Sequence, residues 1–304
     1  MSAPAARRVR VRVPATSANL GPGFDCLGLA VGRYDEVDVE LCAGGLTVDV
    51  YGEGADELPR DQTHLVVSSL HRTAERLGVR LPGLRLRAHN TIPHGRGLGS
   101  SAAAVCAGVL AARALVPDGD ARLPDADLLD LAAGIEGHPD NVAACLLGGL
   151  TLAWADPDAG FRAVRLEPHE SLRPVLFVPP SRLATVTARG LLPATVAHAD
   201  AAANAGRAAL LTHALTGDPG LLLPATEDRL HQAYRAPAMP ASAELVARLR
   251  ADGVPAVVSG AGPSVLALPG PLAPPGESMR EYLPAGWALF VLPVDRTGAV
   301  VRPG

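Results

Sequence analysis

The 304-residue chain contains no lysine, so all 27 of its basic side chains are arginine. Mechanisms that need a lysine are therefore excluded, whether the amine holds phosphates, forms a Schiff base or acts in catalysis. Aromatic residues are also scarce, at 3 %, and no arginine-rich run is interleaved with them. With a net charge of −4, this composition argues against a nucleic-acid partner. An anionic substrate would have to be held by locally placed arginines.

Cysteines and long apolar runs are scarce as well. The four cysteines, Cys26, Cys42, Cys106 and Cys145, are scattered, with no CxxC pair and no histidine spacing typical of zinc. A reduced, cytoplasmic protein fits this usage best. Glycine, proline or arginine interrupts each apolar stretch before it reaches the length of a membrane span, so we expect no membrane partner. The first residues lead directly into alternating apolar and charged residues, so we expect no secretory signal.

Apolar periodicity predicts a mixed succession of strands and helices. Strands are expected at 9–13, 34–41, 46–51, 84–89, 151–155, 173–178, 256–258, 265–268 and 287–294, and helices at 64–77, 100–115, 125–136, 141–147, 196–215 and 242–251. The segments 34–41 and 46–51 are expected to pair as antiparallel strands. Because strands and helices do not alternate regularly, we predict an α+β fold in both halves. The turn-rich segment 156–160 suggests a boundary, with residues 1–157 and 158–304 as the two domains.

A glycine-rich loop joins the expected strand at 84–89 to the expected helix at 100–115. It reads Pro93-His94-Gly95-Arg96-Gly97-Leu98-Gly99-Ser100-Ser101-Ala102-Ala103. Alternate glycines let the backbone approach an anion closely, and the helix offers free N–H groups and the positive end of its dipole. We therefore predict that the loop binds nucleotide phosphates, with the Ser100 hydroxyl as a magnesium ligand. The alternative is an ordinary tight turn before a serine-capped helix.

Four polar side chains crowd the junction between two expected helices: Glu136, His138, Asp140 and Asn141. Glu136 is suited to complete the coordination of magnesium opposite Ser100, because a hard cation prefers oxygen ligands. Structural alternatives exist for three of them. Glu136 can be a helix-end charge, His138 a packing residue, and Asp140 the N-cap of the following helix.

Another polar segment follows the first strand, which we expect to end at Pro14. A loop of small residues then presents Asn19, whose amide can both donate and accept, and Asp25, which can accept from an ammonium group. The alternative is a pair of Asx turns that shape the loop. The sequence thus suggests a loop that can present a carboxylate to an ammonium group.

These motifs resemble those of the galactokinase, homoserine kinase, mevalonate kinase and phosphomevalonate kinase (GHMP) superfamily. The string PHGRGLGSSAA is similar to its PxxxGLGSSAA loop, which wraps the phosphates of ATP. TSANLGPGFD, EGHPDNVA, ATVTARGLLP and DRLHQAYR resemble segments of the homoserine kinases, and VSGAGPSV resembles the third motif of the superfamily. The chain departs from these patterns at Ala184, where serine is usual. It has Asn141 where mevalonate-type members place an aspartate.

The resemblance implies an N-terminal domain like ribosomal protein S5 domain 2, a ferredoxin-like C-terminal domain, and a cleft that binds ATP, Mg²⁺ and L-homoserine. It implies transfer of the γ-phosphate of ATP to the homoserine hydroxyl, a step toward threonine. Asp25 would hold the ammonium group, and two arginines the carboxylate. The implied substrate-binding residues are Asn19, Asp25, His138, Thr185, Arg189, Arg235 and Gly260, and the catalytic ones are Asn141, Asp140 and Arg189. Asn141 would align the hydroxyl, and its proton would pass to phosphate or Asp140, so we name no general base.

Two other functions stay open at this point. One is a shikimate or mevalonate type of alcohol kinase, which the amino-acid-shaped residue set and the missing lysine argue against. The other is a nucleotide-binding regulatory protein without catalysis, against which Ser100, Glu136 and Asn141 weigh. The oligomeric state, a homodimer included, stays open too.

Overall fold

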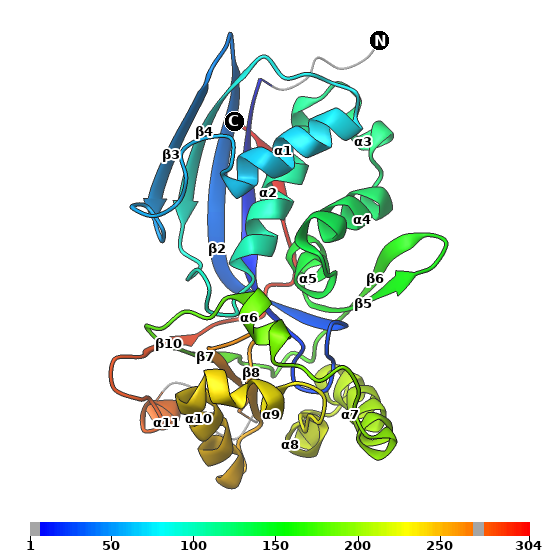
Figure 1. The fold of residues 1–304 in the computed structure, drawn as a ribbon, viewed down its shortest axis with the longest axis vertical. Coiled ribbons are helices and arrows are strands. Elements are labelled where there is room, and N and C mark those ends of the chain that lie inside the picture. The colour runs from blue at the N-terminus through cyan, green and yellow to red at the C-terminus, as the bar shows by residue number, and fades with distance from the viewer. Residues whose placement is uncertain (1–6, 270–276) are drawn as a thin grey trace.

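The computed structural model describes residues 7–269 and 277–304. The first residues of the chain, in which we expect no secretory signal, therefore lie partly outside the description. Two units of sheet and helix meet around helix α6 (Figure 1). Within the described ranges, no helix combines the length and the apolar character needed to cross a membrane.

The larger unit is a seven-stranded sheet with helices packed on one face (Figure 1). The strand order is β11-β1-β2-β4-β3, and β5 pairs with both β2 and β6. The strands are β1 (Arg8–Ala18), β2 (Leu27–Cys42), β3 (Leu46–Gly52), β4 (Gly83–Asn90), β5 (Leu150–Asp156), β6 (Gly160–Leu166) and β11 (Val300–Pro303). The helices are α1 (Leu65–Arg76), α2 (Ser100–Leu115), α3 (Gly119–Arg122), α4 (Asp125–Glu136) and α5 (Asp140–Leu147).

The first strand shows how the pattern of side chains orients the sheet. Val9, Val11 and Val13 are buried under the helices, because alternate residues of a strand point to one face. The expectation that the strand ends at Pro14 is wrong, since β1 continues to Ala18 with a register shift after Pro14. Proline cannot donate to the ladder, and the irregularity accommodates it. The continuation carries the polar segment that begins at Thr16 into the site as regular strand.

The expected antiparallel pairing of 34–41 with 46–51 is also wrong. Strand β4 lies between β2 and β3, antiparallel to β2 and parallel to β3. Parallel neighbours need a crossover connection, and α1 supplies it between β3 and β4. The inner position suits β4 because Leu84, Leu86 and Ala88 on its inward face are all buried.

The smaller unit contains a four-stranded antiparallel sheet of order β10-β7-β9-β8. Its strands are β7 (Val175–Val178), β8 (Ala256–Val258), β9 (Val265–Ala267) and β10 (Ala288–Val291). Its helices are α6 (Thr185–Gly190), α7 (His198–Thr216), α8 (Leu222–Ala225), α9 (Gln232–Arg235), α10 (Pro240–Ala251) and α11 (Glu277–Arg280), with 3₁₀ turns η1 (Pro219–Leu221) and η2 (Ala236–Ala238). This order and the mixed helices confirm the predicted α+β, ferredoxin-like fold. The boundary predicted at 157/158 falls in the turn of the β5–β6 hairpin and stays a prediction.

Candidate active site

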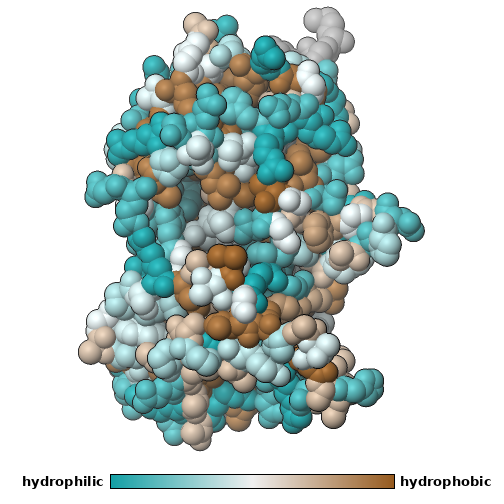
Figure 2. Space-filling model, in the orientation of Figure 1, coloured by the Kyte–Doolittle hydropathy of each residue, from teal (hydrophilic) through white to brown (hydrophobic). Residues whose placement is uncertain are grey.

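A cavity of about 190 Å³ lies where the two units meet. The face drawn in Figure 2 is hollowed between the upper and lower parts of the molecule. Six segments that are far apart in sequence line the cavity: the β1–β2 loop, the β4–α2 loop, the α4–α5 junction, α6, α9 and the β8–β9 turn. The predicted residues among its lining are Asn19, Asp25, Gly95, Gly97, Leu98, Gly99, Ser100, Ser101, Glu136, His138, Asp140, Asn141, Thr185, Arg189, Arg235 and Gly260.

The phosphate loop takes a backbone shape that requires glycine. Gly97 and Gly99 have φ of 71° and 70°, in the left-handed region that other residues seldom adopt. A Cβ on Gly97 would overlap the carbonyl oxygen of Ser259, and one on Gly99 would overlap Oγ1 of Thr16. The loop is therefore packed against both β1 and the β8–β9 turn, with its free N–H groups at the start of α2.

Gly97→Ala is expected to raise the KM for ATP about tenfold. The alanine would strain the backbone and overlap Ser259, so the loop would be displaced, at a free-energy cost of roughly 1–2 kcal/mol. The measurement is initial-rate kinetics with varied ATP. Gly134→Ala is the matched control, since Gly134 lies within α4 and a Cβ there meets nothing within 4 Å. An unchanged KM for ATP in Gly97→Ala would contradict the assignment of the loop.

Three of the other loop residues have different surroundings. Arg96 lies against the smaller unit, where its Nε and Nη2 donate to the carbonyl oxygens of Pro179 and Pro180 at 2.9 and 3.0 Å. His94 and Ala103 line a second cavity, of about 220 Å³, that adjoins the loop at Ser100 and Ser101. Arg96 thus fastens the loop to the second sheet, and its guanidinium is engaged by backbone oxygens.

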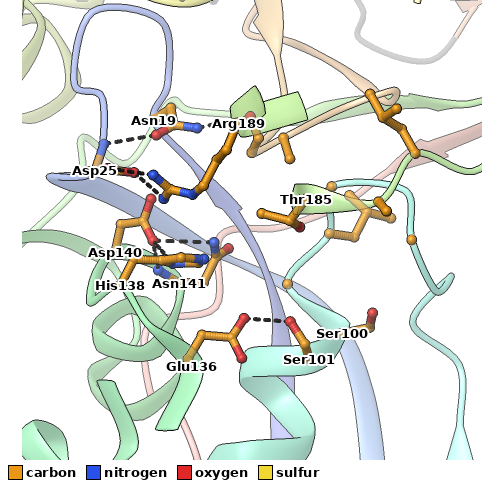
Figure 3. Close-up of a pocket in the computed structure, with 18 of the residues that line it drawn as sticks. Asn19, Asp25, Ser100, Ser101, Glu136, His138, Asp140, Asn141, Thr185 and Arg189 are labelled. Atoms are coloured by element: carbon orange, nitrogen blue, oxygen red, sulfur yellow. Dashed lines mark hydrogen bonds and ion pairs between the residues drawn. The ribbon is translucent and has the colours of Figure 1, made fainter. Parts of the chain in front are cut away.

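The carboxylate predicted as a metal ligand lies beside the start of α2. Ser101 Oγ donates to Glu136 Oε1 at 2.5 Å, whereas the side chain of Ser100 points away (Figure 3). Burial raises the pKa of Glu136 above its ordinary value. No group of three or more His, Cys, Asp or Glu side chains suited to a metal occurs in 7–269 and 277–304. The donor set fits Mg²⁺, which commonly uses one carboxylate and completes its shell with phosphate and water.

A hydrogen-bond network surrounds Asp140, which is 2 % exposed. Its Oδ1 accepts from the backbone N–H of Asn141 at 2.7 Å and contacts His138 Nδ1 at 2.9 Å. Burial would lower the pKa of His138, but the hydrogen bond and charge of Asp140 and the charge of Glu136 outweigh it, and the pKa is raised. Pro139 holds the N-cap position of α5 and Asp140 is the first helical residue, so Asp140 is not the N-cap, although its Oδ1 accepts the N–H of the next residue.

The charged groups expected to hold an amino acid meet at the other end of the cavity. Arg189 Nη1 and Nη2 donate to the two carboxylate oxygens of Asp25 at 2.9 and 2.6 Å (Figure 3). Arg235 is 1 % exposed and its pKa is lowered by burial and by the nearby charge of Arg189. The ring of Phe24 lies 5.6 Å from the guanidinium of Arg189 and 5.3 Å from that of Arg235. The two guanidinium groups carry one positive charge more than the carboxylate of Asp25 balances, so this end of the cavity can bind a second anion.

The predicted amide Asn19 is held by backbone groups. Its Nδ2 donates to the carbonyl oxygen of Gly260 at 2.9 Å, and its Oδ1 accepts the N–H of Asp25 at 2.9 Å. Thr185 lines the cavity at the start of α6. Asn19 thus shapes the loop that presents Asp25, but its bond to the N–H of Asp25 spans six residues and is not the Asx turn of the alternative.

Sequence reasoning missed two side chains of the site and most of the lining of the second cavity. Thr16 donates its hydroxyl to Asn141 Oδ1 at 2.7 Å, and Phe24 stacks on His231 with ring centroids 5.2 Å apart. Both belong to TSANLGPGFD, so the motif itself was the available signal. The second cavity is lined by four residues of the glycine-rich loop, His94, Ser100, Ser101 and Ala103, and by residues that share no motif: Val13, Asp35, Val37, Leu58, His64, Leu65, Val66, Asn90 and Ala104.

Comparison with known proteins gives concordant results. Residues 64–149 match the family model of the GHMP kinases N terminal domain, and residues 201–283 match that of the GHMP kinases C terminal. A homoserine kinase of Streptomyces coelicolor is 60 % identical and covers 100 % of this chain and 98 % of its own. One of Clavibacter michiganensis is 51 % identical, over 97 % and 94 %. The crystal structure of homoserine kinase from Cytophaga hutchinsonii has a TM-score of 0.83 and 29 % identity, over 97 % and 98 %.

Proposed function

Because this chain belongs to the GHMP kinase family, we propose that it transfers the γ-phosphate of ATP to the side-chain hydroxyl of L-homoserine. The products are O-phospho-L-homoserine and ADP, a step in threonine biosynthesis. The observation that carries the proposal is that a phosphate-binding loop and an amino-acid-shaped set of charges, Asp25, Arg189 and Arg235, face one cavity. The high identity to curated homoserine kinases supports the choice of substrate.

The nucleotide is assigned to the two adjoining cavities. Its phosphates would lie on the loop at Gly95–Ser101, against the N-terminal N–H groups of α2. The adenine would enter the second cavity, where Leu58, Leu65 and Val66 provide apolar surface. His64 lies there too, and its two ring nitrogens are buried without a partner among the described residues. Ser101 and Glu136 would hold Mg²⁺, which neutralises phosphate charge when bound.

The amino acid is assigned to the opposite end of the first cavity. The ammonium group of homoserine would replace Arg189 beside Asp25, and its carboxylate would take the guanidinium groups of Arg189 and Arg235. Asn141 would orient the hydroxyl toward the phosphates. Phosphoryl transfer passes through a loose transition state, so positioning and charge neutralisation supply most of the catalysis. The expectation of a reduced, cytoplasmic enzyme belongs to this proposal.

The decisive experiment is ADP release from ATP·Mg²⁺ with L-homoserine, L-serine, L-threonine, shikimate or mevalonate at matched concentration. We expect the highest kcat/KM with L-homoserine, because mevalonate and shikimate lack the ammonium group that Asp25 would hold. L-Serine should place its shorter hydroxyl out of reach of the phosphates. Preference for an alcohol without an α-amino group would overturn the substrate assignment. ATP binding without turnover of any alcohol would favour the regulatory alternative.

A further inference from the structure

Thr16 lies at the centre of the site, between the phosphate loop and Asn141. Thr16 is fully buried, and its backbone N–H donates to the carbonyl oxygen of Leu98 at 3.1 Å. Its Oγ1 donates to Asn141 Oδ1 at 2.7 Å. The same oxygen occupies the space that a Cβ on Gly99 would need. One threonine thus contacts both the loop assigned to the phosphates and the amide assigned to the acceptor hydroxyl.

The direction of the hydrogen bond from Thr16 to Asn141 follows from the carboxylate on the other side of the amide. Asp140 Oδ1 lies 3.4 Å from Asn141 Nδ2 and accepts the Asn141 backbone N–H at 2.7 Å. An ionised carboxylate can only accept, whereas a threonine hydroxyl can donate. Turning the amide over would bring its oxygen against the carboxylate oxygen, which is repulsive. Asp140 and Thr16 together fix the nitrogen on one side and the oxygen on the other.

We propose that Thr16 is a positioning residue for phosphoryl transfer, acting through Asn141. By occupying the amide oxygen, Thr16 leaves the amide N–H groups as the part of Asn141 that can meet the acceptor hydroxyl. It also ties that amide to the phosphate loop through Leu98 and Gly99, which sets the separation between donor and acceptor. The inference rests on the proposed function, because it assumes that Asn141 faces the alcohol.

The arrangement limits the groups that can take the hydroxyl proton. The hydroxyl oxygen accepts from the Asn141 amide while it forms a bond to the γ-phosphorus. The bond from that phosphorus to the β–γ bridging oxygen breaks, and its electron pair leaves with ADP. The Oδ1 of Asn141 is occupied by Thr16 and does not receive the proton, which passes to an oxygen of the transferred phosphoryl group or to Asp140.

Thr16→Val tests this role because valine keeps the shape and removes the hydroxyl. We expect kcat with L-homoserine to fall about 10- to 100-fold, as a released amide misplaces the hydroxyl, while KM for both substrates changes less than threefold. Thr16→Ser should restore most of kcat. Thr151→Val is the matched control, since Thr151 is another fully buried strand threonine, bonded to Gly28 outside the cavity. It should keep the wild-type kcat.

A double-mutant cycle with Asn141→Ala separates positioning from mere packing. If Thr16 acts through Asn141, Thr16→Val should lower kcat in the wild-type background and have little further effect beside Asn141→Ala. A wild-type kcat in Thr16→Val, an equal loss in both backgrounds, or a loss that serine does not restore would each overturn the inference. Failure of the proposed function is seen in a different measurement: the wild-type protein itself would not turn over L-homoserine. In that event the inference is overturned as well.

Discussion

Arg189→Lys is expected to raise the KM for L-homoserine about 10- to 100-fold and to leave the KM for ATP nearly unchanged. The guanidinium of Arg189 donates hydrogen bonds to both carboxylate oxygens of Asp25, at 2.9 and 2.6 Å, and can bind a substrate carboxylate in the same bidentate way. A single ammonium cannot reproduce the fork. Loss of one charge-assisted hydrogen bond costs roughly 1.5–3 kcal/mol, which corresponds to this range of KM. Initial rates with varied homoserine at saturating ATP measure it.

The control for this prediction is Arg229→Lys. Arg229 also donates to a carboxylate, Asp200 at 3.0 Å, but it is exposed and does not line the cavity. Its replacement should leave both KM values as in the wild type. An unchanged homoserine KM in Arg189→Lys would remove Arg189 from the substrate site. A parallel rise in the KM for ATP would instead indicate a general disturbance of the cavity.

Glu136→Gln is expected to lower kcat about 100- to 1000-fold and to raise the Mg²⁺ concentration needed for half-maximal rate. Glutamine keeps the size of the side chain and an oxygen that can accept from Ser101, so the fold should not change. It removes the negative charge, and charge stabilisation through a bound metal supplies several kcal/mol to such a reaction. The measurements are kcat at saturating substrates and a Mg²⁺ titration of the rate. Burial raises the pKa of Glu136, so this carboxylate becomes protonated and loses its charge as the pH is lowered. The wild-type rate should therefore decrease on the acidic side of its pH profile, and Glu136→Gln should lack this decrease.

Glu227→Gln provides the matched control, because Glu227 is paired with Arg207 at 2.9 Å and lies outside the cavity. It should keep both kcat and the Mg²⁺ dependence. A Glu136→Gln variant with the wild-type Mg²⁺ dependence would contradict the role of Glu136 as a cation ligand. Ser101→Ala should also raise the Mg²⁺ concentration needed for half-maximal rate, but by less than Glu136→Gln, since a hydroxyl contributes no charge.

The sequence alone determined the local elements and the motifs of the site. Helices expected at 100–115 and 125–136 are found at Ser100–Leu115 and Asp125–Glu136, because apolar spacing and glycine at their ends act through near neighbours. The order of motifs from Val13 to Val265 identified the family and the fold. The resemblance, residue by residue, also named most of the side chains that the cavity brings together.

Tertiary structure decided how these parts pair. The strands β2 and β3 are neighbours in sequence, yet β4 lies between them, because the α1 crossover and the inward leucines of β4 favour the inner position. Ser100 was predicted to hold a magnesium ion opposite Glu136, but the first turn of α2 directs Ser101 to Glu136 and the side chain of Ser100 points away (Figure 3). Asp25 and Arg189 bind each other across 164 residues, although they were expected to hold separate groups of a substrate.

Spacing along the chain specifies which chemical groups are available, since local backbone preference depends on a few neighbouring residues. Which group faces which depends on contacts between segments that the fold alone brings together. Thr16 illustrates the difference: its place in the TSANLG segment can be read from the sequence, whereas its hydrogen bond to Asn141 spans 125 residues. That contact exists because α5 packs on β1 in the folded chain, beside the phosphate loop.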